Sequence, residues 1–211
     1  MTDVFLRLYA EHPLRQAMAL TVIERLKLMK DARISVITPK GGAGWLKNPD
    51  WQLHVLPERW RLLLADKADF WRSSRQMAED RAESETYVVL DDDHLPIGKW
   101  WLDTGVTALK RRPDYAALAS WSVVRGEVEP EAVAREGIPS DDNVFGTYAL
   151  GTPYFIRKGT VPVFPEGPVH DYDQRVSEVM MRAGHLGFLR HVNHVHIGVG
   201  ASVVIPECWL V

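Results

Sequence analysis

The chain has 211 residues, 46% of them hydrophobic, and a formal net charge of −3. This length is enough for one large domain with a sizeable core, and the charge gives no overall sign of a nucleic-acid-binding protein. The single cysteine, Cys208, excludes an internal disulfide and any zinc site made of several cysteines, so a reducing, cytoplasmic setting is expected. We expect no signal peptide and no transmembrane segment, because no apolar run is long enough to span a bilayer.

The first hundred residues alternate between strand-like runs and helical spacing of apolar residues. The pattern predicts strands at 4–9, 33–38, 52–56 and 86–91, and helices at 13–30 and 64–81. Strands that alternate with helices in this way predict an α/β fold with parallel strands.

The second half of the chain is less regular. The pattern predicts helices at 97–110 and 169–184, and strands at 116–124, 145–148, 153–157, 185–189 and 202–205. No linker rich in Pro, Gly or Ser divides the sequence, so we expect a single domain over residues 1–211.

Three consecutive carboxylates, Asp91-Asp92-Asp93, follow the strand-like run 86–90. Adjacent like charges repel, and a divalent metal is the natural cation to neutralise them because hard cations prefer carboxylate oxygens. Alternation along a strand places Asp91 and Asp93 on one side and Asp92 on the other. The alternative interpretation is an exposed acidic turn.

Two further segments carry side chains suited to chemistry. Asp171 and Asp173 precede a helical run, where one of them could act as a general base or both could simply face the amides of the helix N-terminus. His194 and His196 share a face if their segment is extended, and this spacing near carboxylates favours metal ligation over ordinary polar contacts.

The order of these segments resembles that of glycosyltransferases with the GT-A fold, in particular the large family 2-like group. The segment 90–96 is similar to the family's D-x-D motif, with Asp91 and Asp93 in the acidic positions. The segment 66–75 lies one helix earlier, like the basic start of a helix in the family.

The C-terminal half extends this resemblance. Residues 170–173 followed by Arg182-Ala183-Gly184 are similar to the acceptor-side helix of the family, and 196–198 resembles a late H-x-G motif. Two positions depart from the family pattern: 38–42 replaces an acidic turn that contacts the nucleotide base, and His170 replaces a glutamate. The donor nucleotide is therefore left open.

The resemblance implies a Rossmann-like GT-A architecture: a mostly parallel central sheet flanked by helices, with a smaller mixed acceptor-side half. It implies that residues 1–103 form the half that binds a nucleotide-sugar, and that 104–211 form the half that binds the acceptor and carries the catalytic base.

It also implies a reaction, the metal-dependent transfer of a sugar from a nucleotide-sugar donor to a hydroxyl acceptor with inversion. Asp171 takes the position of the base, and Arg72 or Lys67 that of a phosphate contact. Binding a ribose hydroxyl of the donor is the alternative role for Asp91. The Mn²⁺ or Mg²⁺ ion that bridges the donor diphosphate has four candidate ligands, Asp93, Asp91, His196 and His194.

Several alternatives stay open at the level of sequence. A glycan, a lipid, a protein or a modified DNA base all fit as the acceptor. Other classes are a nucleotidyltransferase of related fold, a metal-dependent hydrolase built on His194 and His196, and a non-catalytic interaction domain.

Overall fold

The structure is a computed structural model that describes residues 1–9, 13–40, 60–122, 141–148, 150–166 and 172–196. Within these ranges, none of the helices combines the length and apolar character needed to cross a bilayer. The elements follow in the order β1 (Thr2–Arg7), α1 (Pro13–Lys27), β2 (Ala32–Pro39), β3 (Arg61–Ala65), α3 (Phe70–Arg81), β4 (Thr86–Asp91), β5 (His94–Pro96), α4 (Trp101–Lys110), β6 (Tyr115–Ser122), β7 (Val144–Thr147), β8 (Tyr154–Arg157), α6 (Tyr172–Met180) and β9 (His185–His196).

The strands described form one sheet of nine strands in the order β3-β2-β1-β4-β8-β6-β9-β5, with β7 paired to β9. β3, β2, β1 and β4 are parallel neighbours, as βαβ connections require. β6 and β9 run in the same direction as these four, whereas β8, β5 and β7 run antiparallel to their neighbours. The predicted α/β fold, a mostly parallel sheet with a mixed second half, is confirmed.

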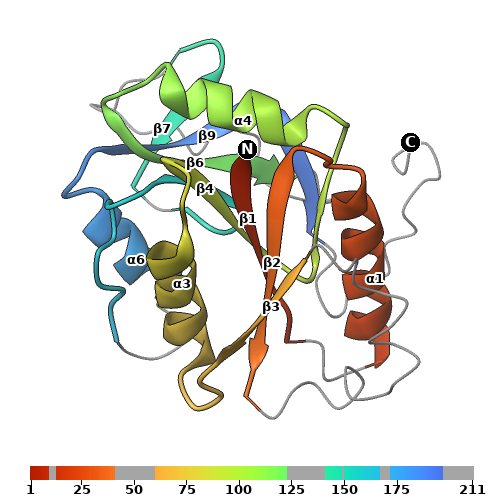
Figure 1. The fold of residues 1–211 in the computed structure, drawn as a ribbon. Helices are drawn as coiled ribbons and strands as arrows, with labels where there is room; N and C mark the ends of the chain where they lie inside the picture. The colour runs from red at the N-terminus through yellow and green to blue at the C-terminus, as the bar shows by residue number, and fades with distance from the viewer. Residues whose placement is uncertain (10–12, 41–59, 123–140, 149, 167–171, 197–211) are drawn as a thin grey trace.

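Helices cover both faces of the sheet (Figure 1). α1 and α4 pack on one face, where their apolar residues join those of β1, β2 and β4 in one buried cluster. α3 and α6 pack on the opposite face and contribute to a second cluster. The result is a three-layer α/β/α arrangement, in which a sheet buried on both faces presents ligand sites at its edges.

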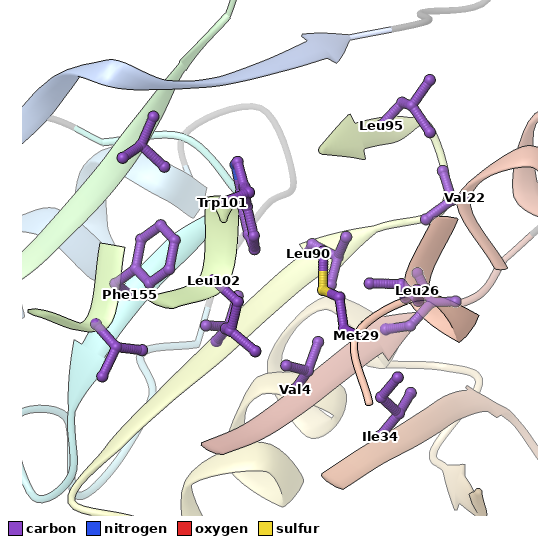
Figure 2. Packing of buried hydrophobic residues seen from close by; sticks show 14 of the residues in the cluster. Val4, Val22, Leu26, Met29, Ile34, Leu90, Leu95, Trp101, Leu102 and Phe155 are labelled. Atoms are coloured by element: carbon purple, nitrogen blue, oxygen red, sulfur yellow. The ribbon is translucent and has the colours of Figure 1, made fainter. Parts of the chain in front are cut away.

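The core beneath α4 is closely packed (Figure 2). Trp101 of α4 lies against Phe155 of β8, with 4.8 Å between the ring centroids. Gly105, one turn later in α4, faces the same ring: a Cβ atom built there would lie 2.1 Å from Cζ of Phe155. The glycine therefore lets α4 approach the sheet closely.

Three expectations from the sequence need comment. The predicted helix 64–81 is wrong at its start, since residues 64 and 65 belong to β3, which pairs with β2, and α3 begins only at Phe70. The final strand is longer than predicted, because 185–196 is one continuous strand rather than a short one ending at 189. The predicted strands at 52–56 and 202–205 lie outside the described residues.

The sheet register brings separate segments to one edge. Arg7 at the end of β1 lies opposite Asp91 at the end of β4. Ser122 at the end of β6 pairs with His194 of β9. These strands share a direction, so their carboxyl ends meet at the same edge of the sheet, where open α/β sheets bind ligands.

Candidate active site

A cavity of about 490 Å³ opens at this edge of the sheet. It contains acids from the end of β4, imidazoles from β5 and β9, and three aromatic side chains. Its lining is Arg15, Trp71, Asp91, Asp93, His94, Ser120, Trp121, Ser122, Gly151, Thr152, Asp173, Phe188, His194 and His196.

Asp91, the last residue of β4, is held by one partner at the end of β1 and by another in the loop before β8. Its Oδ1 forms an ion pair with Arg7 of β1, and its Oδ2 accepts a hydrogen bond of 2.8 Å from the Thr152 hydroxyl. Burial opposes its ionisation, but the positive charges of Arg7 and Arg75, together with the nearby imidazole of His94, outweigh burial and hold the pKa of Asp91 below its ordinary value. Asp91 is therefore an ionised carboxylate of fixed orientation.

Asp92 lies in the turn after β4 and is not among the residues that line the cavity, as the sequence predicts. Its Oδ2 accepts a hydrogen bond of 2.8 Å from the backbone amide of Tyr9, and its Oδ1 lies 3.1 Å from Nη2 of Arg15. Burial, helped by the negative charges of Asp93 and Asp91, raises the pKa of Asp92 to about 7 in spite of the Arg15 charge. The side chain of Asp92 therefore connects the turn after β4 to Tyr9 and to Arg15 of α1.

Asp93 is the carboxylate with the most partners in the cavity. Its Oδ2 lies 2.6 Å from Nη2 of Arg15 and 3.6 Å from Nε2 of His196, and its Oδ1 lies 3.1 Å from Nδ1 of His94. Burial alone would favour the neutral acid. The close imidazoles of His196 and His94 and the guanidinium of Arg15 outweigh burial and hold the pKa of Asp93 far below its usual range.

The histidines come from two paired strands. His94 of β5 is opposite His196 of β9, and their rings stack with centroids 4.4 Å apart and planes 8° apart. His194 is buried two residues earlier in β9, with its Nδ1 2.7 Å from the Ser120 hydroxyl. Burial, followed by the nearby imidazoles of His94 and His196, keeps the pKa of His194 well below its ordinary value, so its imidazole is neutral.

The donor atoms suit a transition-metal ion. Ligand atoms of Asp93, His94 and His196 all lie within 4.8 Å of one another. Oδ2 of Asp93 and Nε2 of His196 are 3.6 Å apart, which lets one ion bond both at about 2.1 Å. One carboxylate and two imidazoles suit Mn²⁺ better than Mg²⁺, which prefers oxygen ligands.

Of the four predicted metal ligands, the structure therefore groups Asp93 and His196. Asp91 and His194 line the same cavity but do not belong to that group. The third member of the group, His94, was not among the candidate ligands at the level of sequence. The signal for it was its place directly after the acidic triplet, but only the pairing of β5 with β9 brings it beside His196.

Asp173, in the first turn of α6, reaches the cavity from the opposite side. Its Oδ1 accepts hydrogen bonds from Nη2 of Arg75 at 2.8 Å and from the Tyr154 hydroxyl at 2.7 Å. Trp71 lines the cavity nearby, with the guanidinium groups of Arg7 and Arg75 4.7 Å and 5.5 Å from its ring centroid. The predicted base, Asp171, lies outside the described residues.

The two predicted phosphate contacts lie away from this cavity. Arg72 donates to the carbonyl of Phe164 at 3.1 Å and forms an ion pair of 3.2 Å with Glu166. Lys67 is exposed in the turn before α3, and neither it nor Arg72 lines the cavity. The cation that does line it is Arg15 of α1, which no sequence motif identifies.

Comparison with solved structures establishes the fold. Two structures of TarS residues 1–349 from S. aureus, in complex with UDP-GlcNAc and with UDP, match at TM-scores of 0.63 and 0.62, each with 13% identity over 92% of this chain. The structure of S. aureus TarS covering more of that protein matches with a TM-score of 0.63 and 14% identity, and there the match spans 36% of its length. This chain spans 57–59% of the TarS 1–349 structures, somewhat more than half of their length.

The likeness confirms the GT-A fold that the sequence resemblance predicts. No protein-family model and no curated protein matches the chain. At 13–15% identity the likeness is one of fold, and the chemistry of the site has to be argued from the residues themselves.

Proposed function

We propose that this chain is a glycosyltransferase that moves a sugar from a nucleotide-sugar to a hydroxyl acceptor. The observation that carries the proposal is the meeting of Asp93, His94 and His196 beside the ionised Asp91, in a cavity at the carboxyl edge of a GT-A sheet. That TarS, with the same fold, binds UDP-GlcNAc and UDP supports it. In this proposal residues 1–103 bind the donor, and 104–211 supply the acceptor side and the base.

We assign the metal site to Asp93, His196 and His94, with Asp91 beside it. A bound Mn²⁺ ion would act as a Lewis acid toward the diphosphate leaving group of the donor. Asp91, paired with Arg7 and oriented by Thr152, keeps further lone pairs on its oxygens that would bind that ion or accept a hydrogen bond from a donor hydroxyl. His194, bonded to Ser120, supports the site from behind the direct ligands.

The base is assigned to Asp171, which would take the proton of the acceptor hydroxyl and give inversion at the anomeric carbon. Asp173 supports this assignment indirectly. Its Oδ1 is occupied by Arg75 and Tyr154, contacts that fix the start of α6 at the cavity. Asp171 stands two positions earlier in the sequence, where the resemblance to the GT-A family places the base.

Thermal-shift measurements with UDP, GDP, CMP and dTDP, each with and without Mn²⁺, test the function. One nucleotide together with Mn²⁺ should raise the melting temperature, because ligand at 100 times its Kd stabilises by about 2.7 kcal/mol. Asp93→Ala should lose this shift, whereas Asp114→Ala, which removes an exposed carboxylate after α4, should keep it. If no nucleotide shifts the wild-type protein, the proposal fails.

Two neighbouring variants test the base. Asp171→Asn should abolish sugar transfer while leaving the nucleotide-dependent thermal shift unchanged. Asp173→Asn should retain measurable turnover, since it keeps an oxygen at the position that Arg75 and Tyr154 contact. Turnover retained by Asp171→Asn but lost in Asp173→Asn would transfer the role of base to Asp173.

A further inference from the structure

Two arginines pair with the acidic triplet, and their side chains differ in exposure and mobility. Arg7 is 2% exposed, lies within the sheet and is stacked on Trp71. Arg15 projects from α1 into the cavity, and its side chain is 26% exposed. Arg7 is thus a fixed counter-ion, whereas Arg15 is a surface-accessible one with a long, flexible side chain.

Arg15 contacts the oxygen that a metal would need. A single nitrogen, Nη2, lies 2.6 Å from Oδ2 of Asp93 and 3.1 Å from Oδ1 of Asp92. That same Oδ2 of Asp93 faces Nε2 of His196 at 3.6 Å, the separation that one ion can bridge. A divalent cation bonded to this oxygen would lie against the guanidinium, and the two positive charges would repel at contact distance.

We propose that Arg15 is a displaceable counter-ion: it holds Asp92 and Asp93 when the site is at rest, and it moves onto the donor diphosphate when the metal binds Asp93. The proposal rests on the proposed function and adds to it a phosphate-binding residue. The backbone of α1 stays in place, because Ala19, Val22 and Leu26 are fully buried against the sheet. Only the side chain of Arg15 has to turn.

A diphosphate is the partner that the freed guanidinium fits. Its forked N–H groups match phosphate oxygens, and such bonds are among the stronger hydrogen bonds in proteins. The cavity it lines is the one that contains the proposed metal ligands, whereas Arg72 and Lys67 lie elsewhere. Arg15 thus fills the role of phosphate contact that the sequence assigned to those two residues.

This exchange couples metal and nucleotide. Metal alone must break the contacts of Arg15 with the carboxylates, whereas a nucleotide diphosphate offers Arg15 a new partner. Each ligand should therefore strengthen the binding of the other, by a factor in the range of about 5- to 150-fold that coupled sites commonly show.

Titration of Mn²⁺, followed by the electron paramagnetic resonance of the free ion, tests the exchange without any turnover. It is done with and without UDP on the wild-type protein, Arg15→Gln, Arg15→Lys and the control Lys27→Gln, which removes a charge paired with Glu24 elsewhere on α1. Arg15→Gln should bind Mn²⁺ alone at least about fivefold more tightly than wild type, and UDP should improve Mn²⁺ binding by a smaller factor than in wild type, because only the direct bond between the metal and the diphosphate remains. The Mn²⁺ affinity of Arg15→Lys should fall between those of wild type and Arg15→Gln, and the affinity of Lys27→Gln should match wild type.

Unchanged or weaker binding of Mn²⁺ alone in Arg15→Gln would overturn the proposal, and Arg15→Lys decides in the same way if the glutamine variant does not fold. A UDP effect that survives intact in Arg15→Gln would also overturn it. Failure of the proposed function looks different: UDP would then leave Mn²⁺ binding unchanged in every variant, including wild type. In that case the phosphate-binding half of the proposal falls too, and the Mn²⁺ titrations alone decide whether Arg15 is a displaceable counter-ion.

Discussion

Replacing Arg7 by methionine should destabilise the fold markedly, because it removes the fixed counter-ion of Asp91. Methionine approximates the aliphatic part of the side chain, so the change is mainly one of charge. The ion pair is buried on both sides: the side chains of Arg7 and Asp91 are 2% and 13% exposed. Thr152 still donates to Asp91 in the variant, but a neutral hydroxyl does not replace the cation.

The expected loss follows from opposing contributions. Two unit charges about 4 Å apart attract by about 4 kcal/mol at an effective dielectric constant near 20. The stacking of Arg7 on Trp71 adds about 0.5–2 kcal/mol. Removing the guanidinium also relieves its repulsion with Arg75 and its own burial cost. Breaking a buried ion pair by deleting one partner costs about 3–5 kcal/mol of stability. Because the loss of the Arg75 repulsion and of the burial cost offsets part of this, we expect Arg7→Met to cost about 3 kcal/mol, at the lower end of that range.

Urea denaturation measures the effect as a lower midpoint at unchanged m-value. Arg182→Met, which removes an exposed arginine, should change stability by no more than about 0.5 kcal/mol. The double variant Arg7→Met/Asp91→Asn should be more stable than the sum of the single changes predicts, with a coupling of about 2–3 kcal/mol. A loss below about 1 kcal/mol for Arg7→Met, or no coupling, would refute the claim that the pair is the internal counter-charge of the triplet.

Three further predictions concern the core, the acid stability and the metal site. Gly105→Ala should destabilise the fold by about 1–3 kcal/mol despite the higher helix propensity of alanine, because its methyl group would overlap the buried ring of Phe155. Thr107→Ala, at an exposed position of α4, should be neutral or slightly stabilising. Equal melting temperatures for the two variants would disprove this. Burial opposes ionisation of Asp3, but hydrogen bonds from a guanidinium and two backbone amides outweigh burial and hold its pKa below the ordinary value. Denaturation at several pH values should show a stability advantage of wild type over Asp3→Asn that is constant above about pH 5 and shrinks as pH falls further. A difference in stability that does not change between pH 7 and pH 3 would contradict this. His196→Ala should weaken Mn²⁺ binding by more than the roughly 10- to 100-fold typical of an outer partner, whereas His194→Ala should stay within that range; the reverse order in calorimetric titrations would make His194 the ligand.

The pattern of apolar residues was sufficient for most of the fold. Strand-like and helical runs alternate along the first half, and this alternation predicts parallel strands joined by helices, as the structure has them. The error at 64–65 has a simple cause: a short leucine-rich run shows no period that separates a strand from a helix. Pairing with β2 decides the matter, and it leaves Leu62 and Leu64 about half exposed on β3.

The histidine segment shows the same limit at the site. Its alternating spacing predicts a shared face for His194 and His196 in an extended segment, and both line the cavity from β9. Their environments nevertheless differ, because Ser120 occupies His194 while His196 stacks on His94 across the β5–β9 pairing. Which histidine faces Asp93 is a property of strand register, and a single sequence does not encode register in its spacing.

By itself, the sequence determined that three carboxylates end a strand of an α/β sheet and that like charges so close together need cations. Only the tertiary structure decided which cations those are. Arg7 and Arg15 lie more than 75 residues from the triplet along the chain, and they reach it through the pairing of β1 with β4 and the packing of α1 beside β5. Charge pairing depends on distance in space, which strand register and helix packing set, and so the arginine counter-ions and the imidazoles that complete the site became visible only in the fold.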